Sequence, residues 1–244
     1  MKAVTFIILW CSVSTLVAQT TINKTVPVHG GQKIRMRFDY PNLVKVSTWE
    51  KNEISIQGTV SINGGESDDA FKLETSTEGN TVSIRNEIKN MENLPHRITV
   101  TMDGRKTVFR NKSEWHKYQD ENGKTHTTIS EGLDMEINLE IKVPRNTETY
   151  VESVYGMVEI VDFTGPLTVE ATYGGVDASL TEPVTGELVA ETNYGRIYTN
   201  LDIKVTTDNV RDEDFHTYVS VKGGNGPRNS FESKYGNVYL RKRK

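Results

Sequence analysis

The chain has 244 residues, one cysteine and a formal net charge of −4, and its basic residues are dispersed except for the final RKRK. This length suits one elongated domain or two small ones. The lack of a basic face argues against a nucleic-acid partner, and the four terminal charges are interpreted as a solvated tail.

Residues 1–18 have the pattern of a secretory signal peptide. Lys2 precedes an apolar stretch over residues 4–17, and Ala18 is a small residue suited to cleavage. A buried N-terminal strand is the alternative interpretation. No later apolar run reaches the ~20 residues of a membrane-spanning helix. We therefore expect a mature chain without a membrane span, exported to the periplasm, the outer surface or the extracellular space.

The one cysteine, Cys11, lies inside this N-terminal segment. After cleavage the chain would have no thiol for a disulfide, for nucleophilic catalysis or for a thiolate metal site. Packing and backbone hydrogen bonds must then supply the stability of the fold.

Residues 19–104 are predicted to form an N-terminal β portion, because apolar and polar side chains alternate with period two. Turn signals such as Gly30-Gly31 separate the runs. The clearest runs are residues 33–38, 43–49, 53–60, 80–86 and 96–102.

Residues 105–133 are rich in charge and poor in aliphatic side chains, which predicts a charged hairpin or excursion that protrudes from the body. Asn122-Gly123 fits a two-residue hairpin turn. Trp115 and Tyr118 either pin this segment to the body or offer a contact surface. The alternating run at 135–144 then predicts a strand that ends at its proline.

Residues 134–244 repeat one phrase, as VESVYGMVEI, VEATYGGVDA, AETNYGRIYT and FESKYGNVYL. The aligned pairs are Tyr155-Gly156, Tyr173-Gly174, Tyr194-Gly195 and Tyr235-Gly236, and Phe215 occupies the tyrosine position of a degenerate fifth unit. The spacings of 18, 21, 21 and 20 residues are typical of proteins with one coil per repeat.

The predicted fold is thus all-β, with the strand-rich N-terminal portion continuing into a C-terminal β-solenoid or β-roll of ~20-residue repeats. Residues 19–244 are expected to form one continuous domain. Antiparallel meander hairpins with a recurring corner are the alternative arrangement of the same units.

Within each unit, side-chain parity predicts which face every residue occupies. The tyrosines share the parity of the apolar residues four positions earlier, so we expect them to stack inside a dry interior. The glycine after each tyrosine is predicted to take a positive φ at a corner. His216 replaces that glycine in the Phe215 unit, which should distort it.

Glutamates recur on the opposite, outward parity of the units. Stacked at the ~4.8 Å spacing of neighbouring strands, they would form a carboxylate ladder. We interpret it as a solvated face that limits aggregation, and a divalent-cation site is the alternative, although such ions need six to eight oxygen ligands. The ladder consists of Glu152, Glu170, Glu191 and Glu232.

Catalytic and cofactor motifs are absent from the sequence. The five histidines are scattered without zinc-site spacing, and there is no nucleophile elbow, P-loop or dinucleotide fingerprint. We therefore predict no catalytic residue, no metal site and no cofactor, although a pair of carboxylates acting on a glycan would leave no motif.

The stretch from Val143-Pro144 through the Tyr-Gly units resembles the bacterial families known as putative adhesins, whose function is unassigned. The resemblance covers residues ~134–240 well and 19–104 more loosely. It implies an exported, all-β, solenoid-like envelope protein, and it carries no catalytic residues. The segment 105–133 departs from the simplest members of these families.

The function we expect is non-enzymatic, namely an exported adhesin-like binding or structural module of the bacterial cell envelope. Its partner would be an envelope glycan, a lipid or a protein. The alternatives are a polysaccharide-active enzyme on a solenoid scaffold and an accessory protein that senses envelope stress. The expected contact surface, beside the glutamates, consists of Arg196, Tyr198, Asn237 and Tyr239.

Overall fold

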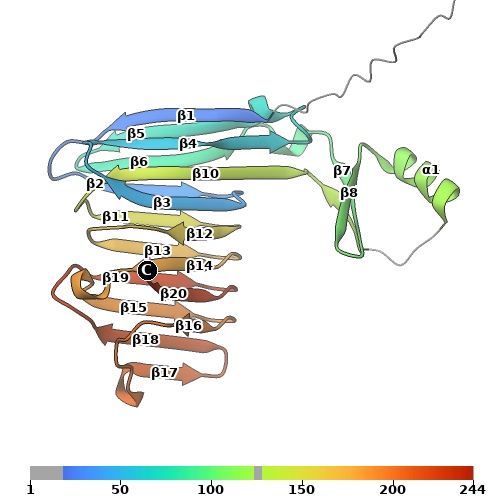
Figure 1. The fold of residues 1–244 in the computed structure, drawn as a ribbon. Coiled ribbons are helices and arrows are strands. Elements are labelled where there is room, and N and C mark those ends of the chain that lie inside the picture. Colours follow the sequence, from blue (N-terminus) through green and yellow to red (C-terminus); the bar gives the residue numbers. More distant parts are fainter. Residues whose placement is uncertain (1–18, 124–127, 244) are drawn as a thin grey trace, which may run out of the picture.

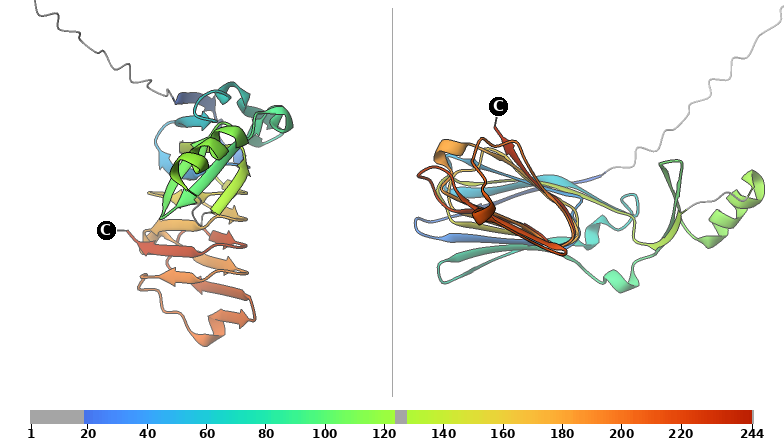
Figure 2. Two further views of the ribbon diagram at one scale, coloured as in Figure 1. Left: turned by 90° about the vertical axis from the view of Figure 1, so that its right-hand side faces the viewer. Right: turned by 90° about the horizontal axis from the view of Figure 1, so that it is seen from below.

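The computed structural model describes residues 19–123 and 128–243. The expected signal peptide, residues 1–18, lies outside the described residues. Strands make up 56% of the structure and helices 10%, so the predicted all-β class is confirmed. Two large sheets lie face to face as an elongated stack, and a small appendage projects from one end (Figures 1 and 2).

Within the described residues, sheet A has eight strands in the spatial order β1-β4-β10-β3-β12-β14-β20-β16. Their bounds are β1 Thr20–Pro27, β4 Glu53–Ile62, β10 Met135–Pro144, β3 Leu43–Trp49, β12 Met157–Ile160, β14 Val176–Leu180, β20 Val238–Lys242 and β16 Ile197–Thr199. The facing sheet B has nine described strands in the order β17-β18-β15-β19-β13-β11-β2-β6-β5. Their bounds are β17 Val210–Glu213, β18 His216–Lys222, β15 Glu187–Thr192, β19 Asn229–Ser233, β13 Leu167–Ala171, β11 Thr149–Ser153, β2 Lys33–Phe38, β6 Thr81–Ile88 and β5 Phe71–Glu78.

The predicted strands of the N-terminal portion and the run at 135–144 are present as β2, β3, β4, β6, β7 (Arg97–Met102) and β10, with ends within two residues of those expected. Both portions of the chain contribute strands to the same two sheets. Short 3-10 helices lie at Asp68–Ala70, Met91–Asn93, Glu182–Val184 and Thr207–Asn209.

The repeat units stack in parallel and in register, but not in the order of the sequence. In sheet B, β13 pairs with β19, and β19 pairs in turn with β15. The Tyr235 unit is therefore inserted between the Tyr173 and Tyr194 units. The hairpin of β17 and β18 packs antiparallel on the other edge of β15, where the next unit of a sequential solenoid would lie.

The degenerate Phe215 unit is a hairpin instead of a coil. Glu213 pairs with His216, so Asp214 and Phe215 form a two-residue turn, in which Asp214 has a φ of 47°. Positive φ at such a turn matches the twist of the paired strands and is tolerated by aspartate. The meander alternative thus describes this one unit, and the parallel arrangement describes the other four.

The interior of the stack is one apolar cluster formed by the inward residues of both sheets. Val151, Val169, Ala190 and Phe231, all four positions before the ring, are buried as predicted. The hydroxyls buried beside them cap the turns, since Ser153 Oγ donates to Tyr155 O at 2.6 Å and Ser233 Oγ donates to Gly174 O at 2.7 Å.

The appendage consists of the small sheet β8-β7-β9 and the helix α1, where β8 is Arg105–Phe109, α1 is Lys112–Asn122 and β9 is Thr128–Gly132. The helix was not predicted, and the expected hairpin turn at Asn122-Gly123 is wrong, because Gly123 caps the end of α1 with a φ of 83°. Asn111 caps its start, accepting a hydrogen bond from Glu114 N at 3.0 Å. Asn-x-x-Glu is the sequence signal that could have found it.

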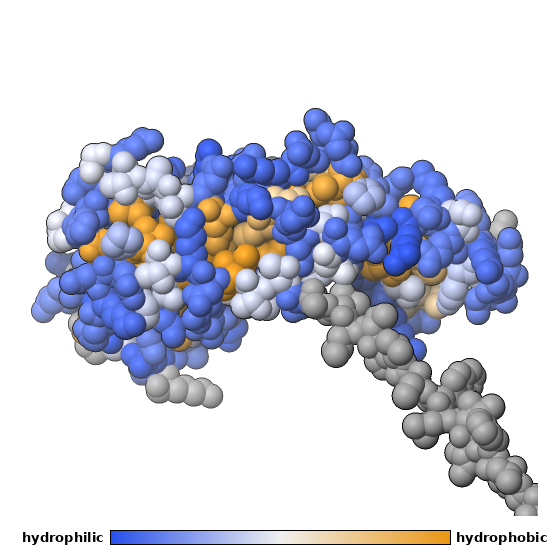
Figure 3. All heavy atoms as spheres, turned by 90° about the horizontal axis from the view of Figure 1, so that it is seen from above, coloured by the Kyte–Doolittle hydropathy of each residue, from blue (hydrophilic) through white to orange (hydrophobic). Residues whose placement is uncertain are grey.

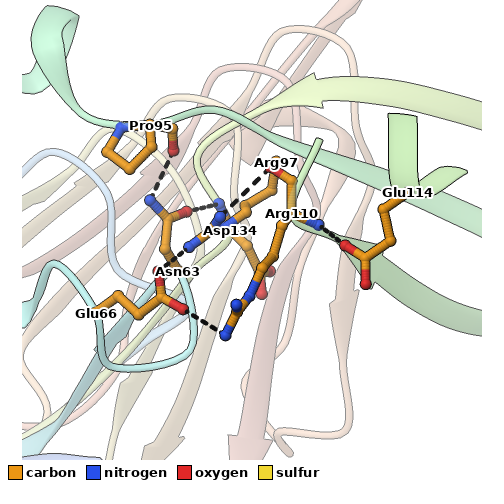
Figure 4. A network of polar contacts seen from close by, with 7 residues as sticks. All are labelled: Asn63, Glu66, Pro95, Arg97, Arg110, Glu114 and Asp134. Carbon is orange, nitrogen blue, oxygen red and sulfur yellow. Dashed lines mark hydrogen bonds and ion pairs between the residues drawn. The ribbon is translucent and has the colours of Figure 1, made fainter. Parts of the chain in front are cut away.

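A polar network joins the appendage to the stack (Figure 4). Asn63 Nδ2 donates to Pro95 O at 2.8 Å. Asn63 N donates to Asp134 O at 2.7 Å, and Asn63 Oδ1 accepts from Asp134 N at 3.2 Å. Glu66 forms ion pairs with the buried Arg97 and with Arg110. These contacts fix the base of the appendage, while its own small core is separate from that of the stack.

Candidate functional site

The aromatic rings of the units form a continuous stack along the edge where turns lead from sheet B to sheet A. Ring centroids lie 5.6 Å apart for Tyr40 and Tyr155, and 5.0 Å apart for Tyr155 and Tyr173. Tyr173 and Tyr235 are 5.1 Å apart, as are Tyr235 and Tyr194. We call this set the aromatic ladder; its members, in order, are Tyr40, Tyr155, Tyr173, Tyr235, Tyr194 and Phe215.

The predicted stacking of the rings is present, but their predicted place in a dry interior is wrong. The four tyrosines of the repeats are 45–58% exposed, and Phe215 is 70% exposed. The strands end two residues before each ring, at Ser153 in the first unit, so strand parity no longer applies at the tyrosine. The ladder is therefore a surface feature.

Tyr40 is a member of the ladder that sequence reasoning missed. It lies between β2 and β3, which pair in parallel with β11 and β12 and so form a further unit of the stack. Its neighbour is Pro41 in place of glycine. The run Phe38-Asp39-Tyr40 before an alternating strand was the available signal.

The glycines after the rings are required by close contact more than by backbone angle. Positive φ was predicted for all four and occurs only at Gly156, with a φ of 81°. A Cβ on Gly174 would lie 1.5 Å from Gly156 O, and one on Gly236 would lie 2.2 Å from Gly174 O. A Cβ on Gly195 would lie 1.9 Å from Gly236 O. Successive turns thus touch backbone to backbone.

The four glutamates form a row on the outer face of sheet B, in the order Glu152, Glu170, Glu232 and Glu191. At one end of the row Arg37 forms an ion pair with Glu152, and at the other end His216 Nε2 lies 2.8 Å from Glu191 Oε1. We call this set the carboxylate row.

Glu232 lies between Glu170 and Glu191 in the carboxylate row. Burial raises the pKa of its carboxyl, and the neighbouring charges of Glu191 and Glu170 raise it further. Beside the row, Tyr150 Oη donates to Glu170 Oε2 at 2.5 Å, and burial together with this bond raises the pKa of the Tyr150 phenol. Arg35 lies over the Tyr150 ring at 4.3 Å.

The cation-binding interpretation of the row gains no support from its geometry. In the described part of the chain, no group of three or more His, Cys, Asp or Glu side chains is arranged to hold a metal ion. Side chains that project in parallel from one flat sheet do not surround a common point, as hard cations require.

The expected contact surface lies on sheet A, away from the carboxylate row on sheet B, so its predicted place beside the glutamates is wrong. Tyr198 and Tyr239 stack with their ring centroids 5.1 Å apart. Asn237 Nδ2 donates to Tyr239 Oη at 3.1 Å, and Asn237 Oδ1 accepts from Arg196 N at 2.9 Å. The structure thus brings these four residues together on two neighbouring turns and strands.

Trp115 and Tyr118 pack inside the appendage. The Trp115 ring is 6% exposed and lies 5.2 Å from Phe109, and Tyr118 lies 5.2 Å from Phe109 and 5.8 Å from Trp115. Trp115 therefore pins α1 to its own small sheet, and Tyr118, with 37% exposure, forms the outer side of this cluster.

A cleft of about 710 Å³ opens between the two sheets where sheet A stops at β16. At this level Ile197 is half-buried and Thr199 is exposed, because no described strand of sheet A lies beyond them. We call it the end cleft; its walls include Leu188, Ala190, Ile197, Leu201, Ile203, Val205, Val219 and Val221, with Arg196, Asp212, Asp214 and Phe215 at its rim.

No protein family and no curated protein match the sequence. One solved structure, a "putative cell adhesion protein" from Clostridium sporogenes, is 9% identical, with 93% of this chain and 100% of that one covered and a TM-score of 0.49. A "putative adhesin" from Bacteroides fragilis is 11% identical, with 93% and 99% covered and a TM-score of 0.23.

Proposed function

We propose that this protein is a non-enzymatic, adhesin-like binding module of the bacterial cell envelope, built on a β-solenoid-like scaffold and exported through residues 1–18. The observation that supports this proposal is the aromatic ladder, whose rings are about half exposed along the whole length of the repeats. Exposed aromatic side chains in a continuous row are unusual on a surface that has no binding role.

The form of the ladder favours an extended, hydroxyl-rich polymer as the ligand. Each ring covers the face of the next, so the ladder presents ring edges and phenol groups to solvent. The hydroxyls repeat with the rungs and can donate and accept hydrogen bonds in water. A glycan chain lying along the ladder would meet the same chemistry at every rung, and we therefore propose an envelope glycan.

The test is binding of purified protein to envelope polysaccharides, with Tyr173→Phe/Tyr235→Phe as the variant. This change keeps both stacked rings and removes two hydroxyls. Loss of two hydrogen bonds of ~1 kcal/mol each should weaken glycan binding about 30-fold. Tyr118→Phe, in the appendage, is the matched control and should bind as the wild type does.

Two results would contradict the proposal. One is unchanged glycan affinity in the double variant together with unchanged urea unfolding. The other is selective binding to anionic vesicles or to an envelope protein with no binding to polysaccharides, which would assign the ladder to a lipid or protein partner instead.

One observation favours the alternative of a polysaccharide-active enzyme, namely the raised pKa of the Glu232 carboxyl beside other glutamates. A general acid in a glycosidase needs such a pKa, but the second carboxylate must flank the scissile bond from another side. Glu170, Glu232 and Glu191 project in parallel from one sheet, which suits binding better than catalysis. Release of reducing ends from a polysaccharide, abolished by Glu232→Gln, would establish the enzyme.

A further inference from the structure

The two ends of the stack are closed to different degrees. At the end formed by β1 and β5, Lys24 points inward from β1, and its Nζ donates to Leu73 O on β5 at 2.8 Å. Figure 3 looks onto this end and shows its apolar surface bordered on both sides by hydrophilic residues. An inward charge on an edge strand is one way in which proteins protect an edge from further pairing. The β1 end therefore discourages the addition of another strand.

At the opposite end, sheet B extends two strands further than sheet A within the described residues. Beyond the unit of β15 and β16, sheet B continues as β18 and β17, while β16 is the last described strand of sheet A. The inner face of β18 therefore has no sheet opposite it, and its Val219 is only half-buried. The end cleft is the space over this two-strand overhang, and it is walled mainly by aliphatic side chains.

The overhang is complementary to itself under a two-fold rotation about an axis parallel to the strands. This rotation exchanges the planes of the two sheets and keeps the direction of every strand. It places β17 and β18 of a second copy beyond β16 of the first, in the plane of sheet A. It also places β16 of the second copy beyond β17 of the first, in the plane of sheet B. The strand counts then close without a gap or an overlap, with β17 of each copy opposite β18 of the other.

The rotation joins β16 of one copy to β17 of the other, and these two strands run antiparallel. The turn at Tyr194-Gly195 reverses the chain between β15 and β16, so those strands run in opposite directions. β18 is antiparallel to β15, and β17 is antiparallel to β18. β17 therefore runs opposite to β16, in one copy and across the joint alike.

The register of the joint follows from the same turn. Thr192 and Ile197 are the inward residues that flank the turn, so they lie opposite each other across the interior. Asp212 lies in the row of Thr192, because both residues pair with Thr217. Since the rotation does not shift the strands along their length, it places Asp212 of one copy beside Ile197 of the other.

The outer edge of β16 is an unused row of backbone hydrogen-bonding groups. Its bonds to β20 use Arg196 O and Asn200 N, so the alternate residues Ile197 and Thr199 direct their N–H and C=O groups outward. No described strand pairs with this edge. An edge of this kind is a template for another strand.

The outer edge of β17 offers the same groups in matching places. Glu213 borders the two-residue turn and bonds across it to β18, so the alternate residues Asp212 and Val210 direct their N–H and C=O groups away from β18. In the register above, Asp212 faces Ile197 of the other copy. Val210 then faces Thr199, and both pairs are of the hydrogen-bonded kind.

The side chains on the outer face of the joint are complementary in charge. The same register places Glu213 of one copy opposite Arg196 of the other, and both side chains are exposed in a single copy. Opposite charges on directly paired residues stabilise antiparallel strands. Arg211 lies opposite the Tyr198 ring in this register, which suits a cation–π contact. Because the joint occurs twice, each of these pairs occurs twice.

Apolar side chains of the overhang are covered by the same arrangement. Val210 lies in the row of Val219, so each faces its counterpart on the other copy across the completed interior. Phe215, which is 70% exposed, lies at the turn between β17 and β18, where the rotation axis leaves the stack. A second copy therefore covers surface that is apolar and exposed in one copy alone.

From these observations we propose that the protein forms a two-fold symmetric dimer in which the two overhangs interlock, with β16 of each copy pairing antiparallel with β17 of the other. Each large sheet of one copy then continues into the opposite sheet of the second copy. Because both copies use the same surface, the contact closes with two copies and does not extend into a chain. This proposal does not rest on the aromatic ladder or on glycan binding.

The test is sedimentation velocity of the full chain over a range of concentration. Arg196→Glu and Glu213→Arg each place like charges in both joints and should raise the dissociation constant of the dimer at least about tenfold. An equimolar mixture of these two variants should form dimers again, because both joints then pair opposite charges. Lys117→Glu and Glu121→Arg, on the exposed side of the appendage helix, are matched controls that should not alter dimer formation. Urea unfolding reports whether each variant folds.

A second measurement tests the backbone pairing at a single position. Thr199→Pro removes an outward N–H group that only the joint uses, and proline is tolerated on an edge strand where its position faces away from the sheet. This variant should dimerise at least about tenfold more weakly than wild type, whereas Thr199→Val keeps the N–H group and should dimerise normally.

Three results would overturn the proposal. One is a folded chain that stays monomeric at all concentrations, including a monomer whose end cleft takes up a fluorescent fatty acid. Another is growth into open-ended oligomers. The third is a dimer that neither the charge variants nor Thr199→Pro weakens.

Discussion

The contact between successive glycine turns predicts that Gly174→Ala destabilises the protein severely. The added Cβ would lie 1.5 Å from Gly156 O, whereas real Cβ atoms are not found closer than 3.0 Å to such neighbours. Both partners are backbone, so no flexible side chain can move aside. The two turns must separate for the methyl group to fit.

The cost can be worked out from the contacts that this separation breaks. Thr172 N donates to Ser153 O at 2.9 Å, Tyr173 N donates to Val154 O at 2.8 Å, and Val158 N donates to Gly175 O at 3.0 Å. The stacked rings of Tyr155 and Tyr173 would part as well. At ~1 kcal/mol for each hydrogen bond and ~1 kcal/mol for the ring pair, the loss is about 4 kcal/mol. That is a large share of the ~5–15 kcal/mol that stabilises a typical domain.

Urea unfolding monitored by circular dichroism measures this loss as a lower midpoint. The matched control is Gly30→Ala, where a Cβ would meet nothing within 4 Å and the backbone angle is not positive. The control should unfold within ~0.5 kcal/mol of wild type. Equal midpoints for Gly174→Ala and Gly30→Ala would refute the close-contact explanation of the repeated glycines.

Three further predictions concern other parts of the molecule. Tyr235→Ala interrupts two ring pairs, whereas Phe215→Ala interrupts only one. Tyr235→Ala should therefore lower the free energy of unfolding by ~1–3 kcal/mol, about twice the loss caused by Phe215→Ala. Equal losses of the two variants in urea unfolding would contradict an additive contribution of the ring pairs. The raised pKa of Glu232 means that the folded state binds its proton more tightly, so stability falls as pH rises above the ordinary value of 4.5. Glu232→Gln should therefore be more stable than wild type at pH 7 and lose this advantage below pH 4.5. A Glu232→Gln variant that is less stable than wild type at neutral pH would contradict the inference that the ionised Glu232 carboxylate destabilises the folded state. Replacing residues 98–131 with a short glycine linker should leave one cooperative unfolding transition. The reason is that Arg97 and Gly132 are paired neighbours, and the appendage has its own core. A broad or absent transition would show that the appendage supports the stack.

The strands of this protein could be predicted from the sequence because their signal is local. Alternation with period two fixes which residues of β2, β3 and β10 point inward, whichever strands lie beside them. The repeated phrase likewise identified the rings that stack and the glutamates that form a row, since residues at equal positions of in-register units must be neighbours.

Alternation also has limits within the candidate site. It ends where the strand ends, and the rings lie beyond that point, so the sequence could not place Tyr155 on the surface. In the appendage, α1 has no apolar stripe to reveal it, and its helical state is signalled only by the cap at Asn111. Trp115 is buried because Phe109 is brought beneath it by strand pairing, which no local pattern contains.

The sequence by itself determined the all-β class, the inward faces of the strands and the existence of the stacked units. The tertiary structure alone decided the order of those units, with the Tyr235 unit inserted between its two relatives, and it also decided that the glycines serve contact instead of positive φ. The physical reason is that the units are nearly interchangeable as neighbours, since each offers the same parallel edge. The hairpin of β17 and β18 covers one edge of β15, and the last unit pairs with the other edge, between β13 and β15.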